Sequence, residues 1–168
     1  MEIDAVLIEA MDRVRQAVPE VVAGLDEDQL AWRPDPRANS IAWLVWHLTR
    51  VADDHVAEVA GVEQVWTRDG WYERFALPFP PEAHGYGQGA DEVGQVRVAA
   101  DLLAGYHDAV AAMVHDYLGT LAAADLERVV DERWDPPVTL GVRLVSVIDD
   151  CAQHVGQAAY VRGMLERA

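Results

Sequence analysis

Three side chains in this sequence have the types and the spacing to bind one metal ion. Asp150 and His154 lie four residues apart in a long helical pattern, so both side chains project from one helix face, with Cβ atoms about 5–6 Å apart. His47 lies near the start of a second helical pattern, after the apolar run that begins at Ile41. A histidine from a second, packed helix would complete a set of two imidazoles and one carboxylate, which suits a divalent ion.

Both histidines fall on helix faces that are predicted to point inward. His47 shares its face with Leu44, and His154 shares its face with Val155. An inward imidazole without a partner is costly, and a carboxylate beside it, such as Asp150, requires a cation, an arginine or a change of protonation. From spacing alone, a hydrogen-bonded core histidine and a surface Asp–His hydrogen bond remain alternatives to a metal site.

Two polar residues of the His47 helix could border this site. Asp54 lies two turns after His47 on the same face, about 10.5 Å along the helix axis. A solvated position is favoured there over lining a pocket mouth or contacting a ligand residue. Arg50 could bind a substrate carboxylate, and a salt bridge to Asp53 or Asp54 is an equal alternative.

The other histidines and the cysteine have weaker patterns. His55 is predicted to be rotated away from the site and exposed, with contact to a loop as the alternative. For His84, an approach to the site from above is the less favoured alternative. His107 and His115 are interpreted as structural or exposed. Cys151 points about 100° away from its preceding neighbour around the helix, so we interpret it as a small buried hydrophobe rather than as a nucleophile.

Four long helical stretches must position these residues. Apolar residues recur at helical spacing over residues 3–24, 40–61, 91–121 and 139–166. Ser40 and Thr139 are expected N-caps, and Pro19 is expected to kink or divide the first helix. The predicted fold is all-α, an antiparallel four-helix bundle that forms a single domain over residues 1–168.

The segment of residues 61–90 breaks the helical pattern. It interleaves prolines and glycines with the aromatic residues Trp71, Tyr72, Phe75, Phe79 and Tyr86. A connection this long without its own secondary structure is usually functional or disordered, and so many aromatic residues argue against disorder. We expect a crossover loop between the second and third helices that folds over one end of the domain. The polar connection of residues 125–137 is expected to hold at most a short extended piece at Val129 and Val130.

Composition excludes several classes of function. The formal net charge is −16, whereas binding to nucleic acids or anionic membranes depends on clustered basic residues. No run of about 18 apolar residues predicts a membrane span, and no export signal is visible at the N-terminus. The single cysteine excludes an internal disulfide, so a cytoplasmic location is expected.

Two motifs resemble the DinB superfamily of metal-binding four-helix bundles. They are SIAWLVWHL at residues 40–48 and the pattern that joins Asp150 and His154 to Gly156, Gln157 and Ala158. More narrowly, the chain resembles the mycothiol-dependent maleylpyruvate isomerase-like branch, and residues 32–34 (Trp-Arg-Pro) and 85–87 (Gly-Tyr-Gly) fit the same pattern. The resemblance spans nearly the whole chain. Its motifs are specific for the fold and the metal site but poorly specific for the reaction.

The resemblance implies that His47, Asp150 and His154 hold a divalent ion, with zinc or nickel expected. Many members of the superfamily have histidine at the position of Asp150, and the isomerase branch has an acidic residue there. Because aspartate is one methylene shorter than glutamate, ligand reach or metal preference could differ in this chain. Three protein ligands leave open positions for water or substrate, as in catalytic sites.

The resemblance further implies a divalent-metal-dependent enzyme that uses a low-molecular-weight thiol, such as mycothiol, in isomerase or S-transferase chemistry. A metal-bound thiol is deprotonated, which supplies a nucleophile at neutral pH. One alternative is a stress-related protein that binds a metal or small ligand without catalysis. A less favoured alternative is a non-haem iron enzyme, which uses the same ligand types. The expected partners are a small-molecule substrate and a second copy in a homodimer, with neither nucleic acid nor membrane.

Overall fold

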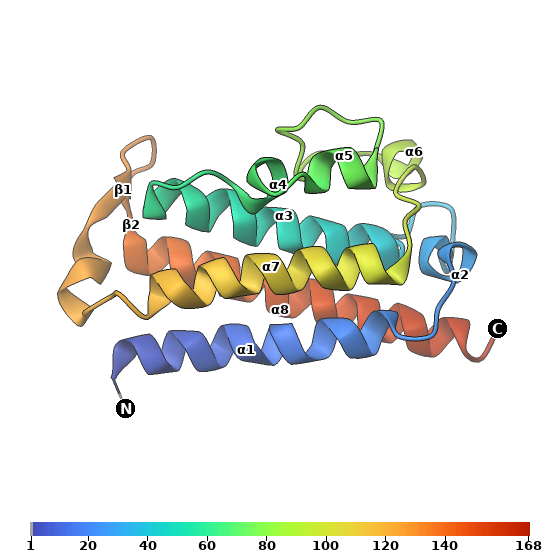
Figure 1. Ribbon diagram of the computed structural model, residues 1–168, viewed down its shortest axis with the longest axis horizontal. Helices are drawn as coiled ribbons and strands as arrows, with labels where there is room; N and C mark the ends of the chain where they lie inside the picture. Colours follow the sequence, from blue (N-terminus) through green and yellow to red (C-terminus); the bar gives the residue numbers. More distant parts are fainter. Residues whose placement is uncertain (1) are drawn as a thin grey trace.

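A computed structural model describes residues 2–168 and is mainly helical (Figure 1), as predicted. Within these residues the α-helices are α1 (Ile3–Val22), α2 (Glu27–Ala31), α3 (Ile41–Ala60), α4 (Val65–Arg68), α5 (Trp71–Phe75), α6 (Ala90–Val93), α7 (Ala100–Leu118) and α8 (Leu140–Leu165). A 3₁₀ helix, η1 (Ala123–Glu127), precedes a two-stranded antiparallel sheet of β1 (Val129–Asp131) and β2 (Val138–Thr139). The strand β1 includes the short extended piece that the sequence predicts. None of the described helices is long and apolar enough to cross a membrane.

The four long helices α1, α3, α7 and α8 lie side by side (Figure 1). Helix α3 packs against α7 and α8, and α1 packs against the same two helices. Helices α1 and α8 run in one direction, and α3 and α7 run in the other. Because α3 and α7 run the same way, the chain between them must return along the length of α3. This return explains why the connection of residues 61–99 is so long.

The predicted boundaries of the helices that carry the candidate ligands are close to those observed. The Ser40 hydroxyl accepts a hydrogen bond from the Trp43 backbone N–H (3.1 Å) at the start of α3, and Gly61 ends the helix in the left-handed conformation (φ 69°). The Thr139 hydroxyl accepts from the Val142 backbone N–H (3.4 Å) at the start of α8. The spacing of candidate ligands along both helices is therefore retained.

The predicted start of the third long helix at residue 91 is wrong. Residues 90–93 form the separate helix α6, and α7 begins at Ala100. Val96 and Val98 are buried while Arg97 between them is exposed, which is the two-residue alternation of extended chain. Burial of these two valines therefore replaces the expected helical turns. In the first helix, Pro19 does not divide α1, which continues to Val22.

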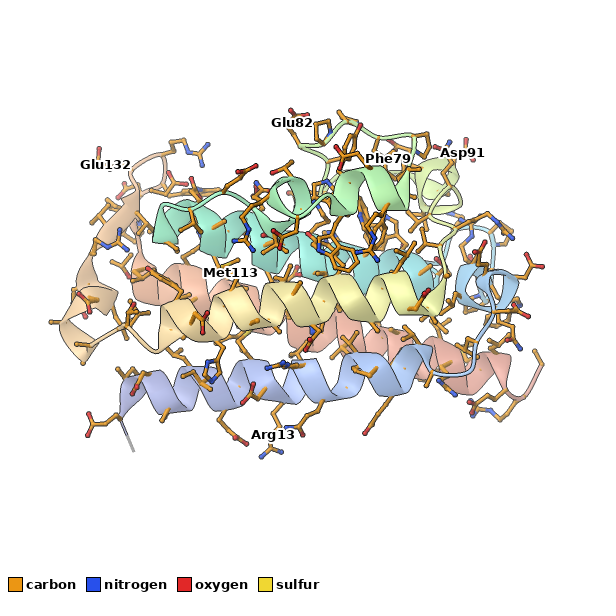
Figure 2. All side chains as sticks on the ribbon, in the orientation of Figure 1. Arg13, Phe79, Glu82, Asp91, Met113 and Glu132 are labelled. Atoms are coloured by element: carbon orange, nitrogen blue, oxygen red, sulfur yellow. The ribbon has the colours of Figure 1, made fainter. Side chains whose placement is uncertain are left out.

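The segment of residues 61–90 contains helices α4 and α5, so the expectation of a loop without secondary structure is wrong. Helix α4 packs against α3 and α7, and α5 packs against α7, so the segment lies along the long helices rather than over one end. Phe79 is buried against Trp46, with ring centroids 5.6 Å apart, whereas Glu82 is exposed (Figure 2). Trp71, Phe75 and Phe79 of the segment thus form part of the core, whereas Tyr86 is exposed.

A buried arginine holds this segment on α3. Arg50 is fully buried, and its guanidinium donates to the carbonyl oxygens of Ala83 (3.1 Å) and Pro81 (3.3 Å) and to Gln64 Oε1 (2.8 Å). It also lies 3.6 Å from Asp53 Oδ2. Of the two alternatives for Arg50, the structure therefore has the salt bridge to Asp53, and the guanidinium is not free to bind a substrate carboxylate.

A buried carboxylate holds the same segment one turn along α3. Asp53 accepts hydrogen bonds from the backbone N–H groups of Val65 and Trp66 (2.8 Å each) and from the Tyr106 hydroxyl of α7 (2.7 Å). Burial raises the pKa of Asp53, while these donors and Arg50 oppose that shift. The Arg50–Asp53 pair thus joins α3, α7 and the crossover segment.

His107 is a buried core histidine of α7, which agrees with its interpretation as structural. The Thr49 hydroxyl donates to the Val45 carbonyl (2.8 Å), so His107 Nδ1–H donates to Thr49 Oγ1 (3.0 Å). His107 Nε2 is buried without a hydrogen-bond partner among residues 2–168. Burial lowers the pKa of His107 to about 4, with a smaller raising effect of Asp108 and a lowering effect of Arg15.

Because of His107, we expect the free energy of unfolding to be lower in acid than at neutral pH. The unfolded chain takes up a proton on this imidazole near pH 6.5, whereas the folded protein does so only near pH 4. The free energy of unfolding should therefore fall by about 3 kcal/mol between pH 7 and pH 4 through this residue alone. Urea unfolding of the wild type and of His107→Gln at both pH values measures the difference.

The exposed His115 of the same helix provides the control for this prediction. His115→Gln should show the wild-type dependence on pH. Equal losses of stability for His107→Gln and the wild type between pH 7 and pH 4 would contradict the assignment.

Candidate metal centre

Side chains of α3 and α8 meet at one point between the two helices. His47, Asp150 and His154 each offer one potential ligand atom, and these three atoms lie within 4.8 Å of one another. The ring centroids of the two histidines are 4.9 Å apart, and His154 Nε2 lies 3.5 Å from Asp150 Oδ1. The structure thus brings together the three residues that the sequence selects.

The carboxylate of Asp150 is incompletely satisfied by the protein. Its Oδ2 is buried and has no hydrogen-bond partner within the described part of the chain. Leaving a buried carboxylate oxygen without a partner costs more than about 1–3 kcal/mol, because the group carries charge. A cation between Asp150 and the two imidazoles would remove this cost, so the donor set fits a divalent ion.

His47 is held in an orientation suited to a ligand. Its Nδ1–H donates to the backbone carbonyl of His84, which can only accept, so the lone pair of the ring lies on Nε2. Trp43 stacks on the ring with centroids 4.6 Å apart and an interplanar angle of 17°, and the Trp43 indole N–H donates to Gln88 (2.8 Å). Burial lowers the pKa of His47, which favours the neutral, coordinating form.

His154 is oriented in the same way. Its Nδ1 lies 2.8 Å from Gln157 Oε1, one turn further along α8, so Nδ1 carries the proton and Nε2 faces Asp150. When the ring is protonated, Nε2–H donates to Asp150, which raises the pKa of His154, and burial opposes this. Oxygen acceptors at the far nitrogen of metal-binding histidines fix the tautomer and the ring orientation. Both histidines here have such an acceptor.

Gly85 permits the close approach of the crossover segment to His47. Its φ is +99°, and a Cβ atom at this position would lie 2.6 Å from His47 Nδ1 and 3.1 Å from Trp43 Cζ2. The carbonyl that orients His47 belongs to the preceding residue, His84. A side chain at position 85 must therefore displace either the segment or the imidazole.

We expect Gly85→Ala to lower the affinity for a divalent ion by about 10- to 100-fold, the range seen when the groups that orient metal ligands are lost. Competition with a chromophoric chelator measures this affinity. Gly87→Ala is the matched control, because Gly87 also has positive φ (+79°), but a Cβ atom there would lie more than 4 Å from every other group of residues 2–168 outside its chain neighbours. Equal metal affinities of the two variants would show that the close approach of Gly85 to His47 does not affect metal binding.

A cavity of about 420 Å³ opens beside the three residues. Its lining residues come from α3, the crossover segment, the β1–β2 connection and α8: His47, Val51, His55, His84, Tyr86, Trp134, Arg143, Ser146, Val147 and Asp150. Tyr86 and Trp134 are 88% and 65% exposed, so they form an aromatic rim on the cavity that the buried His47 and the half-buried Asp150 also line. This arrangement can admit a small molecule to a bound ion.

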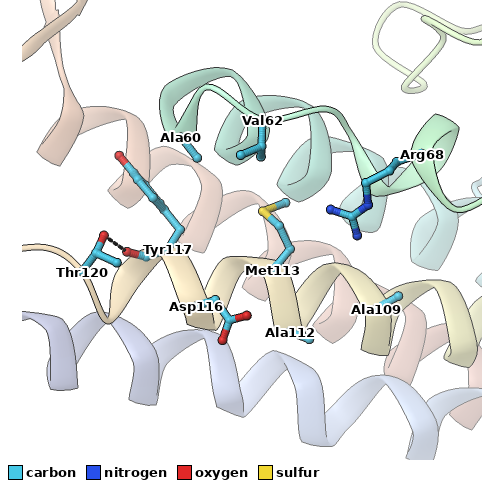
Figure 3. A pocket seen from close by; sticks show the side chains of 9 residues that line it. All are labelled: Ala60, Val62, Arg68, Ala109, Ala112, Met113, Asp116, Tyr117 and Thr120. Atoms are coloured by element: carbon cyan, nitrogen blue, oxygen red, sulfur yellow. Dashed lines mark hydrogen bonds between the residues drawn. The ribbon is translucent and has the colours of Figure 1, made fainter.

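A second cavity, of about 560 Å³, lies away from these residues (Figure 3). It is lined by Ala60, Val62, Arg68, Ala109, Ala112, Met113, Asp116, Tyr117 and Thr120. Arg68 is paired with the adjacent Asp69 (2.8 Å). Despite its larger volume, this cavity contains none of the three candidate ligands, and we do not assign the chemistry to it.

Comparison with known proteins identifies the family. A family model described as mycothiol-S-transferase matches residues 6–167. The chain belongs to the mycothiol-S-transferase family, which is DinB-like. The resemblance to the DinB superfamily is therefore confirmed, and the family description includes the thiol that the resemblance implied.

One solved structure similar to this mycothiol-S-transferase family member is described as the conserved protein of a locus from Enterococcus faecalis. The two chains are 32% identical, with a TM-score of 0.93, and the alignment covers 100% of this chain and 99% of the other. No curated protein matches the chain.

Two histidines of this mycothiol-S-transferase family member lie closer to the candidate site than the sequence predicted. His84 approaches the site from above, the alternative that the sequence disfavoured, because its backbone carbonyl orients His47 and its side chain lines the cavity. His55 is half-buried and lines the same cavity, whereas the sequence predicted an exposed residue turned away from the site. The guanidinium of Arg143 lies 3.2 Å from His55 Nδ1, so His55 contacts α8.

Neither Cys151 nor Asp54 lies at the candidate ligands as a reactive group. Cys151 is buried, its thiol donates to the Leu48 carbonyl (3.5 Å), and burial raises its pKa far above the ordinary value, as expected for a core residue rather than a nucleophile. Asp54 is partly exposed and accepts from Gln64 Nε2 (2.7 Å), at a neighbouring pocket rather than at the candidate ligands.

Three residues that line the cavity, Arg143, Ser146 and Trp134, were not predicted from the sequence. The position of Arg143 carried a usable signal, because it lies seven residues before Asp150 and therefore on the same face of α8. Trp134 carried none, since its location depends on how the β1–β2 connection folds against the helices.

Proposed function

We propose that this protein is a divalent-metal-dependent mycothiol S-transferase. The single observation that carries the proposal is the convergence of His47, Asp150 and His154, including one unpartnered carboxylate oxygen, beside an open cavity that His47 and Asp150 line. The family match supports the thiol and the transfer reaction. In this proposal the four long helices form a DinB-like four-helix bundle in which α3 is antiparallel to α8 and α1 is antiparallel to α7, and residues 1–168 are one domain.

The proposed ligands are neutral His47 and His154 through Nε2, and ionised Asp150. A divalent ion at this site, zinc or nickel in our proposal, would hold the thiol of mycothiol as its thiolate. Transfer forms a bond between the sulfur and an electrophilic carbon of the second substrate, whose leaving group departs with its electron pair while the thiol proton passes to solvent. Val51 and Val147 give the cavity apolar walls beside the reacting groups. The family description favours transfer over isomerisation.

Conjugation of mycothiol to a model electrophile, such as monochlorobimane, tests this proposal. We expect the metal-loaded protein to form the thioether well above the protein-free rate, and Asp150→Ala to lose most of that activity. Asp149→Ala, which removes the adjacent exposed carboxylate, is the matched control and should retain it. Conjugation at the background rate with zinc, nickel and iron would reject the transferase activity and favour a protein that binds metal without catalysis.

The proposed setting is the cytoplasm, where low-molecular-weight thiols are kept reduced. The proposed partners are the small-molecule substrates and a second copy of the chain in a homodimer, with no role for nucleic acid or membrane. Sedimentation equilibrium measures the oligomeric state independently of activity.

A further inference from the structure

A polar pocket adjoins the cavity of the candidate metal centre. This distal pocket has a volume of about 450 Å³ and is lined by Asp54, His55, Ala57, Glu58, Val62, Gln64, His84, Arg133 and Arg143. It shares His55, His84 and Arg143 with the metal-centre cavity. His55 lies eight residues after His47, which is about 12 Å along α3. An extended molecule with one end at His47 could therefore reach the distal pocket.

The arginines of the distal pocket are already neutralised. Arg143 lies 2.6 Å from Glu58 and 3.6 Å from the buried carboxylate of Asp131. Arg133 lies 2.8 Å from Asp131. Together with Asp54, the carboxylates of Glu58 and Asp131 outnumber the two guanidinium groups by three to two. A ligand carboxylate placed here would meet a net negative charge, and it would have no unpaired arginine within the described lining to bind.

The same side chains suit uncharged hydroxyl groups. Asp54 and Glu58 can accept hydrogen bonds from hydroxyls, and the N–H groups of Arg133 and Arg143 can donate to them. A hydroxyl both donates and accepts, so it can use this alternation of groups without introducing charge.

We propose that the distal pocket binds the uncharged, hydroxyl-rich part of the thiol cosubstrate and so selects a neutral sugar thiol over thiols that carry carboxylates. This inference rests on the proposed function, because it places the sulfur end at the metal centre. Within it, the aromatic rim of Tyr86 and Trp134 is left for the electrophile.

Calorimetric titration with S-methyl mycothiol tests the pocket without requiring turnover, because the thioether cannot react as a nucleophile. We expect Asp54→Ala and Glu58→Ala each to weaken its binding about tenfold, the effect of losing one hydrogen bond to a charged group. Asp116→Ala, which removes an exposed carboxylate in the cavity of Figure 3, is the control and should bind as the wild type does.

A change of selectivity tests the charge argument directly. S-methyl glutathione, which carries two carboxylates, should bind the wild type at least about tenfold more weakly than S-methyl mycothiol. Asp54→Arg turns the net charge of these groups from negative to positive, so it should strengthen the binding of S-methyl glutathione while weakening that of S-methyl mycothiol. Equal binding of the two thioethers to the wild type, or no effect of the Asp54 and Glu58 variants, would overturn the inference.

N-acetylcysteinamide, a neutral thiol without a sugar, separates this inference from the proposed function. If it is conjugated as efficiently as mycothiol, the distal pocket adds nothing and the inference is rejected, while the transferase proposal stands. If no thiol is conjugated but S-methyl mycothiol still binds in a manner sensitive to Asp54, the transferase proposal is rejected and the pocket assignment is supported.

Discussion

Alanine at His47, Asp150 or His154 is expected to abolish stoichiometric metal binding. The three side chains come from two helices, and each supplies one ligand atom of a group that lies within 4.8 Å. Loss of an orienting group alone typically lowers metal affinity 10- to 100-fold, so loss of a ligand should cost at least about 100-fold. Elemental analysis of freshly purified, untagged protein should give about one ion per chain for the wild type and background for each variant.

Two matched variants control for nonspecific effects on metal content. Asp149→Ala removes an exposed carboxylate beside Asp150, and His115→Ala removes an exposed histidine of α7. Both should retain the wild-type metal content. Retention of the ion by any of the three ligand variants would contradict the assignment of that residue. The element itself separates the chemistries: zinc or nickel agrees with the proposed function, and iron favours the non-haem alternative.

The second large effect, a loss of folding stability, is expected for Asp53→Ala. This replacement would leave Arg50 fully buried without its carboxylate partner and remove the acceptor for the N–H groups of Val65 and Trp66. Breaking a buried ion pair on one side costs about 3–5 kcal/mol. Urea unfolding should show this loss for Asp53→Ala, whereas Asp54→Ala, at the neighbouring and partly exposed residue, should lose less than about 1 kcal/mol.

A double variant distinguishes an unpaired charge from a simple loss of packing. Replacing both residues by apolar ones, as in Arg50→Met with Asp53→Leu, leaves no unpaired buried charge, so it should cost less than the two single changes together. Additive losses would show that the pair acts as two independent contacts. Because the segment held by this pair carries His84, Asp53→Ala should also weaken metal binding.

The candidate ligands could be selected from the sequence because their geometry is set within single helices. The i, i+4 spacing of Asp150 and His154 fixes their common face, and the caps at Ser40 and Thr139 keep that spacing in register. The inward position of His47 follows from the apolar residues around it. Only the packing of α3 on α8 had to be assumed, and the burial of both apolar faces favours it.

The surroundings of the ligands could not be predicted in the same way. The group of His84 that orients His47 is a backbone carbonyl, which every residue has, so no side-chain pattern marks it. Gly85 was visible as part of a Gly-Tyr-Gly sequence, but the contact that requires glycine comes from α3. The start of α7 was misplaced because Val96 and Val98 are buried in extended chain, which a helical apolar pattern also accommodates.

Anomalous diffraction from crystals of the metal-loaded protein tests the central assignment most directly. We expect one strong peak bonded to His47 Nε2, His154 Nε2 and the Asp150 carboxylate at about 2.0–2.2 Å, with the remaining coordination open towards the cavity of Tyr86 and Trp134. A peak held by other side chains, or a fully occupied ion that leaves any of these three residues uncoordinated, would contradict it.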